Sequence, residues 1–114
     1  LCVGQVVGGV VQGLGSALWE GFRFDENGRF LNPAFVDYKI PTVKDIPRRM
    51  QQIFLETPQP DGPYGARGIA EHPMISVPSA IGNALCDALK IDFTALPLDC
   101  ERVLLAILGD GGCS

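Results

Sequence analysis

The first nineteen residues contain five glycines and no charged side chain, and this stretch constrains the fold most strongly. Apolar residues recur along it at helical spacing, at Val3, Val7, Leu14 and Leu18, which predicts an N-terminal helix. The glycines leave it short of a membrane span of ~20 apolar residues, and it lacks the basic start of a signal peptide. Each interior glycine costs up to ~1 kcal/mol relative to alanine, so we expect another element or a ligand to lie directly against this helix.

Strand signals follow the glycine-rich segment. The pair Asn27-Gly28 lies between two short aromatic segments and supplies the positive φ of a tight turn, which predicts a β-hairpin. Residues 34–40 alternate in polarity and end at Pro41, whereas residues 51–56 group three apolar side chains just before a proline-rich loop. Both segments are predicted to be further strands.

Two helices are predicted in the second half of the chain. Pro73 or Pro78 suits the first turn of a helix that presents one apolar face as far as Lys90. We expect this face to pack on the sheet. Asp99 is a candidate N-cap for a last helix, which should stop at Gly109.

Taken together, these segments predict an α+β fold, in which a small mixed sheet with a hairpin is packed by two or three helices. The sequence contains no internal repeat and no linker, so residues 1–114 are expected to form a single α+β unit. A chain of 114 residues can bury one modest core. Residues 109–114 are expected to be a frayed tail.

Charge and cysteine content exclude several classes of function. The net charge is -4, from 9 Lys and Arg against 13 Asp and Glu, and no basic patch is present, so nucleic acid is not an expected partner. The four cysteines form no Cys-x-x-Cys pair and accompany a single histidine, His72, so no zinc or iron–sulfur site is predicted. Cys86 falls in an apolar helical pattern and is interpreted as a reduced thiol, which favours a cytoplasmic location.

Glu71 is the strongest candidate for a catalytic side chain. It ends a glycine-containing loop, residues 65–71, just before Pro73, and Arg67 adds a positive charge nearby. Glycines allow the backbone to approach a ligand closely, and a carboxylate in such a loop can act as a base. The alternative interpretation is an exposed glutamate that gains a little stability near a helix N-terminus.

Three blocks of sequence, in order, resemble one known family. They are Gly-Gln-Val-Val-Gly-Gly-Val-Val-Gln-Gly-Leu-Gly at residues 4–15, Asp-Tyr-Lys-Ile-Pro-Thr at residues 37–42, and Gly-Ile-Ala-Glu at residues 68–71. They resemble the C-terminal part of the molybdopterin-binding subunit of the xanthine dehydrogenase/aldehyde oxidase (molybdenum hydroxylase) family. Ile69 and Ala70 depart from the Val and Gly that the family has before its glutamate.

This resemblance implies a function, a cofactor and partners. Gln5 would contact the molybdopterin-type molybdenum cofactor, and Glu71 would be the active-site base in the oxidative hydroxylation of an aldehyde or N-heterocycle. The chain would be a fragment of a larger molybdopterin-binding domain, inactive by itself. Its partners would be the remainder of the subunit, iron–sulfur and flavin subunits, and a small-molecule substrate. The alternative is a non-catalytic interaction module or relic that kept this fold segment.

Overall fold

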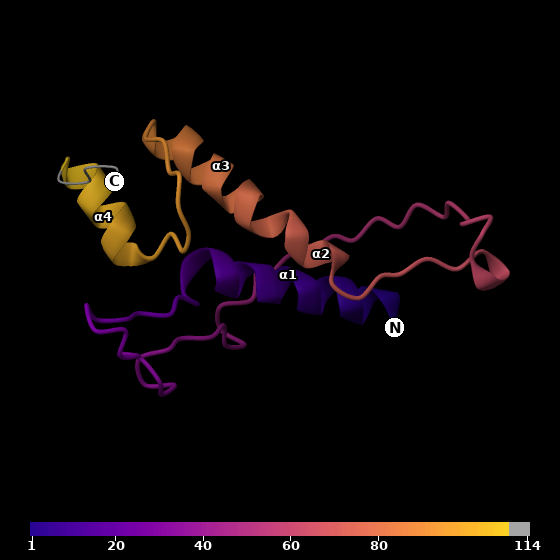
Figure 1. The fold of residues 1–114 in the computed structure, drawn as a ribbon. Helices are drawn as coiled ribbons and strands as arrows, with labels where there is room; N and C mark the ends of the chain where they lie inside the picture. Colours follow the sequence, from indigo (N-terminus) through magenta and orange to yellow (C-terminus); the bar gives the residue numbers. More distant parts are fainter. Residues whose placement is uncertain (110–114) are drawn as a thin grey trace.

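The computed structural model describes residues 1–109, and helices are its regular elements. The elements in chain order are α1 (Cys2–Leu18), the short 3-10 helix η1 (Pro63–Gly65), α2 (His72–Ile75), α3 (Val77–Leu89) and α4 (Cys100–Leu108) (Figure 1). None of the helices in the described range is long and apolar enough to cross a membrane.

The predicted α+β fold is wrong, because residues 1–109 contain no strand and no sheet. At the predicted hairpin, the Asn27-Gly28 turn is closed by one isolated antiparallel bridge between Phe24 and Phe30. Residues 34–40 form turns, and residues 51–56 run as irregular chain. A strand is stabilised by pairing with a neighbour, and a lone hairpin is marginal in water, so strand-type sequence alone did not produce a sheet here.

The predicted helices are confirmed: of the two starts considered, Pro78 lies in the first turn of α3, and Pro73 lies in the short α2 that precedes it. The two helices are separated at Ser76, and their apolar face packs on α1 rather than on a sheet. The last helix, α4, begins as predicted at Asp99, whose carboxylate accepts a hydrogen bond from the Arg102 amide at 2.8 Å. It ends at Gly109, which has a φ of 80°. The predicted frayed tail lies, apart from Gly109, outside the described residues.

Glycines in α1 allow the helices to cross at close range. A Cβ at Gly9 would lie 3.0 Å from the Pro73 Cβ, and a Cβ at Gly13 would lie 2.6 Å from the Val77 Cβ. Side chains at these two positions would therefore push α2 and α3 away from α1. At the other end of α1, a Cβ at Gly15 would overlap the Glu20 carboxylate. Three of the five glycines are thus explained by protein packing.

The core of the chain is small. Ala17 and Leu98 are the buried hydrophobic residues, and the Leu98 amide donates a hydrogen bond to the Ala17 carbonyl at 2.6 Å. Asn32 is buried near them and links two segments, since its side chain accepts from the Arg23 amide and donates to the Gly21 carbonyl. The Leu98 contact attaches the chain after α3 to the C-terminal end of α1, whereas the Asn32 contacts hold residues 21–32 together.

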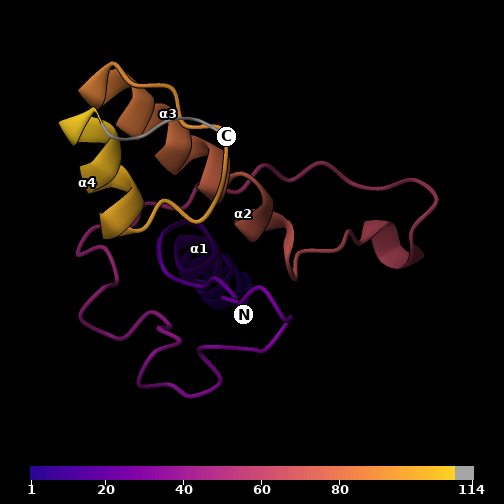
Figure 2. The ribbon, with the colours of Figure 1, turned by 60° about the vertical axis from the view of Figure 1, so that its left-hand side comes forward.

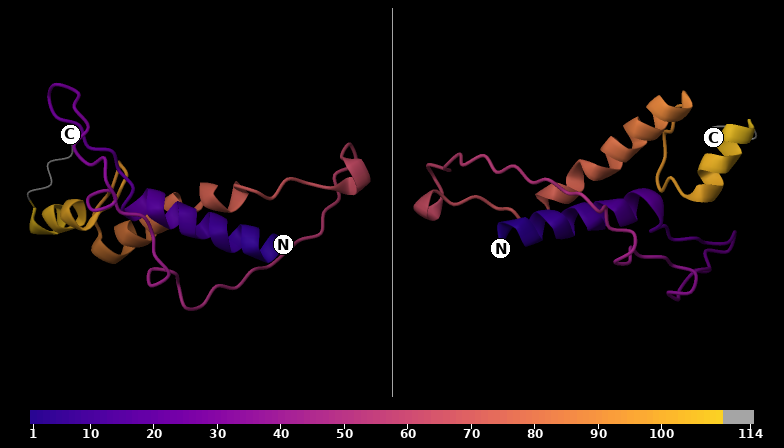
Figure 3. Two further views of the ribbon diagram at one scale, coloured as in Figure 1. Left: turned by 90° about the horizontal axis from the view of Figure 1, so that it is seen from below. Right: turned by 180° about the vertical axis from the view of Figure 1, so that it is seen from behind.

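The molecule is far from compact. Its radius of gyration is 17.5 Å, whereas a compact chain of this length has about 13 Å. Residues 46–71 leave the helices as a long arm that turns at η1 and returns to α2, and Figure 2 shows the arm pointing away from the rest of the chain. Seen from below and from behind, the tip of the arm at η1 stands clear of the helices (Figure 3).

Candidate functional site

Glu71 lies where the returning limb of the arm meets the helices. It is the N-cap residue of α2, with φ of -104° and ψ of -2°, and its carbonyl accepts a hydrogen bond from the Met74 amide at 3.0 Å. Its carboxylate is exposed and makes no hydrogen bond or ion pair with any described residue. The side chain is therefore free to act on a ligand.

The glycine contacts determine which end of α1 faces Glu71. Gly9 touches Pro73 and Gly13 touches Val77, so α1 and the α2–α3 segment run in the same direction through their crossing. Gln5 lies one turn before Gly9 on the same face of α1, because residues four apart share a helix face. Gln5 therefore faces the chain that precedes Pro73. The structure brings Gln5 and Glu71 to the same end of the helix crossing.

The surface of α1 around Gln5 is open. The Gln5 side chain is exposed and has no hydrogen-bond partner among the described residues, and a Cβ at Gly4 or Gly8 would meet no atom within 4 Å. A flat molecule can therefore approach the helix backbone beside Gln5. The five glycines thus fall into two groups, three used in packing and two facing free space.

Arg67 and His72, which flank the candidate base, have other contacts. The Arg67 guanidinium donates a hydrogen bond to the Thr57 hydroxyl at 2.9 Å, so it ties the two limbs of the arm together. The His72 ring lies beside Gly68, where a Cβ would be 3.4 Å from its Cε1 atom. Neither side chain is paired with Glu71. The supporting charge expected from Arg67 therefore serves the arm, a role that the sequence did not reveal.

The second sequence block, residues 37–42, packs against the C-terminal end of α1. The Tyr38 hydroxyl donates a hydrogen bond to the Glu20 carboxylate at 3.2 Å, and the Glu20 side chain in turn covers Gly15. Desolvation, followed by the charge and hydrogen bond of Glu20, raises the pKa of the Tyr38 phenol. Glu20 and Tyr38 position this block away from Glu71, so the second block supports α1 rather than the candidate base.

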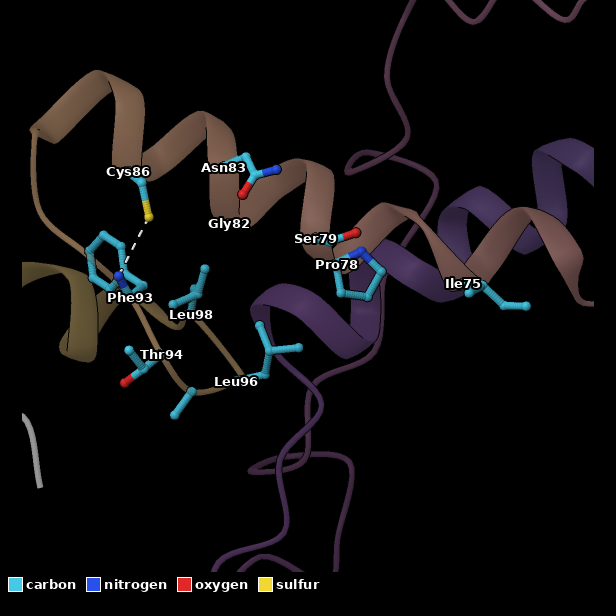
Figure 4. Close-up of a pocket in the computed structure, with 11 residues that line it drawn as sticks. Ile75, Pro78, Ser79, Gly82, Asn83, Cys86, Phe93, Thr94, Leu96 and Leu98 are labelled. Atoms are coloured by element: carbon cyan, nitrogen blue, oxygen red, sulfur yellow. Dashed lines mark hydrogen bonds between the residues drawn. The ribbon is translucent and has the colours of Figure 1, made fainter.

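A groove lies between α3 and the chain that follows it. Ile75, Pro78, Gly82 and Cys86 form one wall, and residues 93–96 with Leu98 form the other (Figure 4). The Cys86 thiol accepts a hydrogen bond from the Phe93 amide at 3.4 Å and is half-buried. Neither Gln5 nor Glu71 lines this groove. The candidate site and the groove are therefore separate.

Comparison with known proteins identifies the class to which these residues belong. The family described as molybdopterin cofactor-binding domain matches residues 1–47. Over 104 residues the chain is 38% identical to the putative xanthine dehydrogenase molybdenum-binding subunit of Escherichia coli, spanning 90% of this chain and 14% of that protein. It is 36% identical over 104 residues to the aldehyde oxidoreductase of Megalodesulfovibrio gigas, spanning 91% of this chain and 11% of that protein.

A solved structure gives the same result. The crystal structure of quinoline 2-oxidoreductase from Pseudomonas putida aligns with a TM-score of 0.86 and 34% identity, over 93% of this chain and 14% of that one. The fold and the sequence together define a segment of a molybdopterin-binding domain. The chain belongs to the xanthine dehydrogenase/aldehyde oxidase family of molybdenum hydroxylases, and the resemblance drawn from the three blocks is confirmed. It spans 11–14% of the length of these relatives.

The open surface at Gln5 fits one edge of a molybdopterin cofactor. An amide offers two N–H donors and a carbonyl acceptor in one plane, which matches the donors and acceptors on the rim of a pterin. Gly4 and Gly8 leave the adjacent helix backbone uncovered. These three residues can contact one side of such a cofactor. They cannot enclose it.

Proposed function

We propose that this chain supplies Glu71 as the active-site base and Gln5 as a cofactor contact to the molybdopterin site of a molybdenum hydroxylase. One observation carries the proposal: the contacts of Gly9 with Pro73 and of Gly13 with Val77 direct Gln5 and Glu71 to the same end of the helix crossing. Both side chains lack partners in the described chain. The reaction would be the oxidative hydroxylation of an aldehyde or an N-heterocycle.

Glu71 would act by accepting a proton. The cofactor, when bound, supplies a metal that activates oxygen for transfer and accepts electrons from the substrate. A carboxylate is acceptor-only when ionised, so Glu71 can take the proton of the attacking group and later release it to water. The Glu71 carbonyl accepts a hydrogen bond from the Met74 amide, which fixes the Glu71 backbone at the start of α2. General-base catalysis of this kind contributes about 10²- to 10⁴-fold in rate.

The remainder of the reaction would depend on partners. The other segments of the molybdopterin-binding subunit would enclose the cofactor, and iron–sulfur and flavin subunits would carry electrons away. A cytoplasmic location is part of this proposal, because it fits the unpaired Cys2, Cys86 and Cys100. The substrate would enter from the side of the site that this chain leaves open.

Replacement of the base tests the proposal. In a complete subunit carrying this segment, Glu71→Gln keeps the size of the side chain and removes the carboxylate. We expect turnover to fall by at least about 10²-fold, while molybdenum and pterin contents stay near those of the wild type. The matched control is Glu26→Gln, which alters an exposed glutamate in the hairpin turn and should leave turnover unchanged. Loss of less than tenfold in Glu71→Gln would end the proposal for this residue.

The contact of Gln5 is tested by cofactor loading. Gln5→Leu removes the amide donors and acceptor, so we expect lower cofactor occupancy or an altered metal spectrum. The control is Gln12→Leu, because Gln12 is an exposed glutamine on the same helix. If Gln5→Leu and Gln12→Leu load equally and give the wild-type spectrum, Gln5 does not touch the cofactor.

One observation favours a second candidate function, a non-catalytic interaction module. The chain has only a small buried core and a long unsupported arm, as expected of a piece that functions by contacting other protein. The variant Glu71→Gln distinguishes the two functions. If the chain is a non-catalytic module, this variant should still bind its partners, and no oxidation reaction should depend on the Glu71 carboxylate.

A further inference from the structure

Arg67 bonds a neutral hydroxyl, although an unpaired carboxylate lies four residues further along the chain. Its guanidinium donates to the Thr57 hydroxyl at 2.9 Å and makes no ion pair with any described residue. The Glu71 carboxylate has no hydrogen-bond or ion-pair partner among the described residues either. Because arginine forms its strongest hydrogen bonds with carboxylates, often two at once, this choice of acceptor needs a physical reason.

The tip of the arm places the Thr57 hydroxyl beside Arg67. The Gln59 amide donates to the Gly65 carbonyl at 3.0 Å, which joins the two limbs two residues after Thr57 and two residues before Arg67. The Thr57 amide also donates to the Leu55 carbonyl at 3.1 Å. The two side chains therefore face each other across the arm, and the hydroxyl is the acceptor that the backbone presents to Arg67.

The Glu71 carboxylate lies within reach of Arg67 once this hydroxyl is removed. Four residues span at most about 14 Å when fully extended, and the chain here is shorter because residues 70 and 71 form a bend. Residues 67–70 make no backbone hydrogen bond with any described residue, so their backbone does not resist a movement of Arg67. Arginine and glutamate both have long side chains, and the two can meet across this distance.

Pairing with Arg67 would make Glu71 a weaker base. A neighbouring cation favours the ionised form of a carboxylate, and a guanidinium can occupy both of its oxygens. Other charges around Glu71 are few: α1 has no charged side chain, α2 has one titratable group, His72, and the one charged residue of α3, Asp87, lies near its far end. Arg67 is also the cation nearest to Glu71 in the sequence.

A solved relative shares the path of the arm. The match to quinoline 2-oxidoreductase covers 93% of this chain, and the unmatched 7% is shorter than the arm. Most of the arm therefore follows a path that is compatible with a much longer chain around it. The approach of residue 57 to residue 67 can accordingly be tested in a complete subunit.

We propose that Thr57 is a positioning residue that holds Arg67 away from Glu71, so that the carboxylate stays unpaired and able to accept a proton. The proposal rests on the function proposed above, in which Glu71 is the active-site base. Thr57 acts through Arg67 and takes no part in the reaction itself.

Removal of the hydroxyl in a complete subunit carrying this sequence tests the proposal. Thr57→Val keeps the shape of the side chain and releases Arg67 to pair with Glu71. We expect kcat to fall by about tenfold, which is part of the about 10²- to 10⁴-fold that a general base contributes. The acidic limb of the pH–rate profile should move to lower pH, because a paired carboxylate stays ionised at lower pH.

Two further variants are the controls for this measurement. Thr57→Ser keeps the hydroxyl and should have the rate and pH profile of the wild type. Thr94→Val alters another exposed threonine and should also leave both unchanged. An unchanged kcat and profile in Thr57→Val would overturn the proposal, and so would an equal loss in Thr57→Ser.

Substitution of the arginine distinguishes pairing from damage to the arm. In an Arg67→Gln background, Thr57→Val has no cation to release. The doubly substituted subunit should therefore turn over at the rate of Arg67→Gln alone. If Thr57→Val causes the same loss in both backgrounds, the hydroxyl only stabilises the arm, and the proposal is wrong.

A crystal structure of the Thr57→Val subunit gives a measurement that does not depend on activity. The Arg67 guanidinium should lie within hydrogen-bond distance of the Glu71 carboxylate. A guanidinium that stays beside residue 57, or turns away from Glu71, would contradict the proposal.

These measurements distinguish failure of this proposal from failure of the proposed function. If Glu71→Gln abolishes turnover but Thr57→Val leaves it unchanged, Glu71 remains the base and Thr57 is not a positioning residue. If Glu71→Gln loses less than tenfold, the proposed function fails, and the role of Thr57 fails with it.

Discussion

The helix crossing and the arm both contain apolar side chains, yet only the crossing is folded against other parts of the chain. At the crossing, Gly9 and Gly13 admit Pro73 and Val77 to van der Waals distance of the α1 backbone. In the arm, Ile53 and Leu55 remain exposed and the backbone of residues 46–54 makes no hydrogen bond within the described chain. The two regions meet at Glu71, which ends the arm and begins α2.

The difference lies in where the hydrogen-bond partners come from. A helix satisfies its backbone within one segment, so α1, α2 and α3 form from local sequence and need only a complementary surface. A strand satisfies its backbone through a neighbour that can be distant in sequence. The described residues accordingly contain helices stabilised by local hydrogen bonds, whereas the strand-type segments at residues 34–40 and 51–56 find no pairing partner among them.

The largest expected effect concerns the chain by itself. Purified alone from a host that makes the cofactor, the 114-residue chain should be free of molybdenum, inactive and self-associated. Gln5 and Glu71 cannot enclose a cofactor, and the exposed apolar surface of the arm should drive association. Metal analysis, dye-linked oxidation of aldehydes and purines, and light scattering would measure this. Stoichiometric molybdenum with turnover would show that the arm needs no partner and would remove the contrast between the two regions.

The second prediction tests the crossing. Gly13→Ala in a complete subunit introduces a Cβ 2.6 Å from the Val77 Cβ and 3.1 Å from the Met74 carbonyl oxygen. We expect a loss of about 1–3 kcal/mol from overpacking, seen as a lower temperature of thermal inactivation. The control is Gly82→Ala, whose added Cβ would lie 3.9 Å from Leu98, an ordinary contact distance. If Gly13→Ala and Gly82→Ala lower the inactivation temperature equally, the close approach of α3 to Gly13 does not hold the helices together.

The same contrast explains which sequence predictions succeeded. The α1 helix and the two ends of α4 followed from local signals, namely apolar spacing, the Asp99 cap and Gly109. The sheet did not follow, because residues 34–40 and 51–56 have strand-type composition but no partner in the described chain. Sequence spacing also could not divide the glycines of α1 into those that pack and those that face free space. Their assignment depends on Pro73 and Val77, more than 60 residues away.

The sequence proposes residues for the candidate site but not their geometry. Gln5 and Glu71 were identified through the three blocks, and their proximity to one end of the crossing came from the register of Gly9 with Pro73. Arg67 was expected near Glu71 as a supporting charge, but the structure directs it to Thr57. A single hydroxyl ten residues earlier in the sequence determines where that charge goes, and no pattern in the sequence indicated it.

A smaller effect is expected at the start of α4. Asp99→Ala in a complete subunit removes the oxygen that accepts from the Arg102 amide, which should cost about 1 kcal/mol. Asp99→Asn retains an acceptor at the same position and should cost less. Arg23 also lies 3.5 Å from Asp99, but its side chain is mostly exposed and such pairs contribute little. If Asp99→Asn and Asp99→Ala are equally destabilising, the charge of Asp99 stabilises this helix, and its N-cap hydrogen bond does not. The start of α4 would then not be explained by a local capping signal.

The smallest expected effect concerns the turn at residues 42–45, just before the arm. It tests whether neighbouring residues are sufficient to form this turn. The Asp45 carboxylate accepts hydrogen bonds from the Thr42 hydroxyl at 2.7 Å and from the Thr42 amide at 2.8 Å. These two bonds, the hydroxyl first, lower the pKa of Asp45 below its ordinary value of 3.8. Because the folded pKa is lowered, the turn is stabilised above pH 3.8 and loses this stabilisation as the pH falls through the folded pKa.

Thr42→Val removes the hydroxyl and keeps the amide, so the pKa of Asp45 should rise part of the way back towards its ordinary value. NMR titration of the Asp45 carboxyl carbon in the 114-residue chain would measure the change, since both partners lie within four residues. The control is Thr94→Val, which alters an exposed threonine distant in sequence and should leave the titration of Asp45 unchanged. An unaltered midpoint in Thr42→Val would mean that the Thr42 hydroxyl does not hold this turn in the isolated chain.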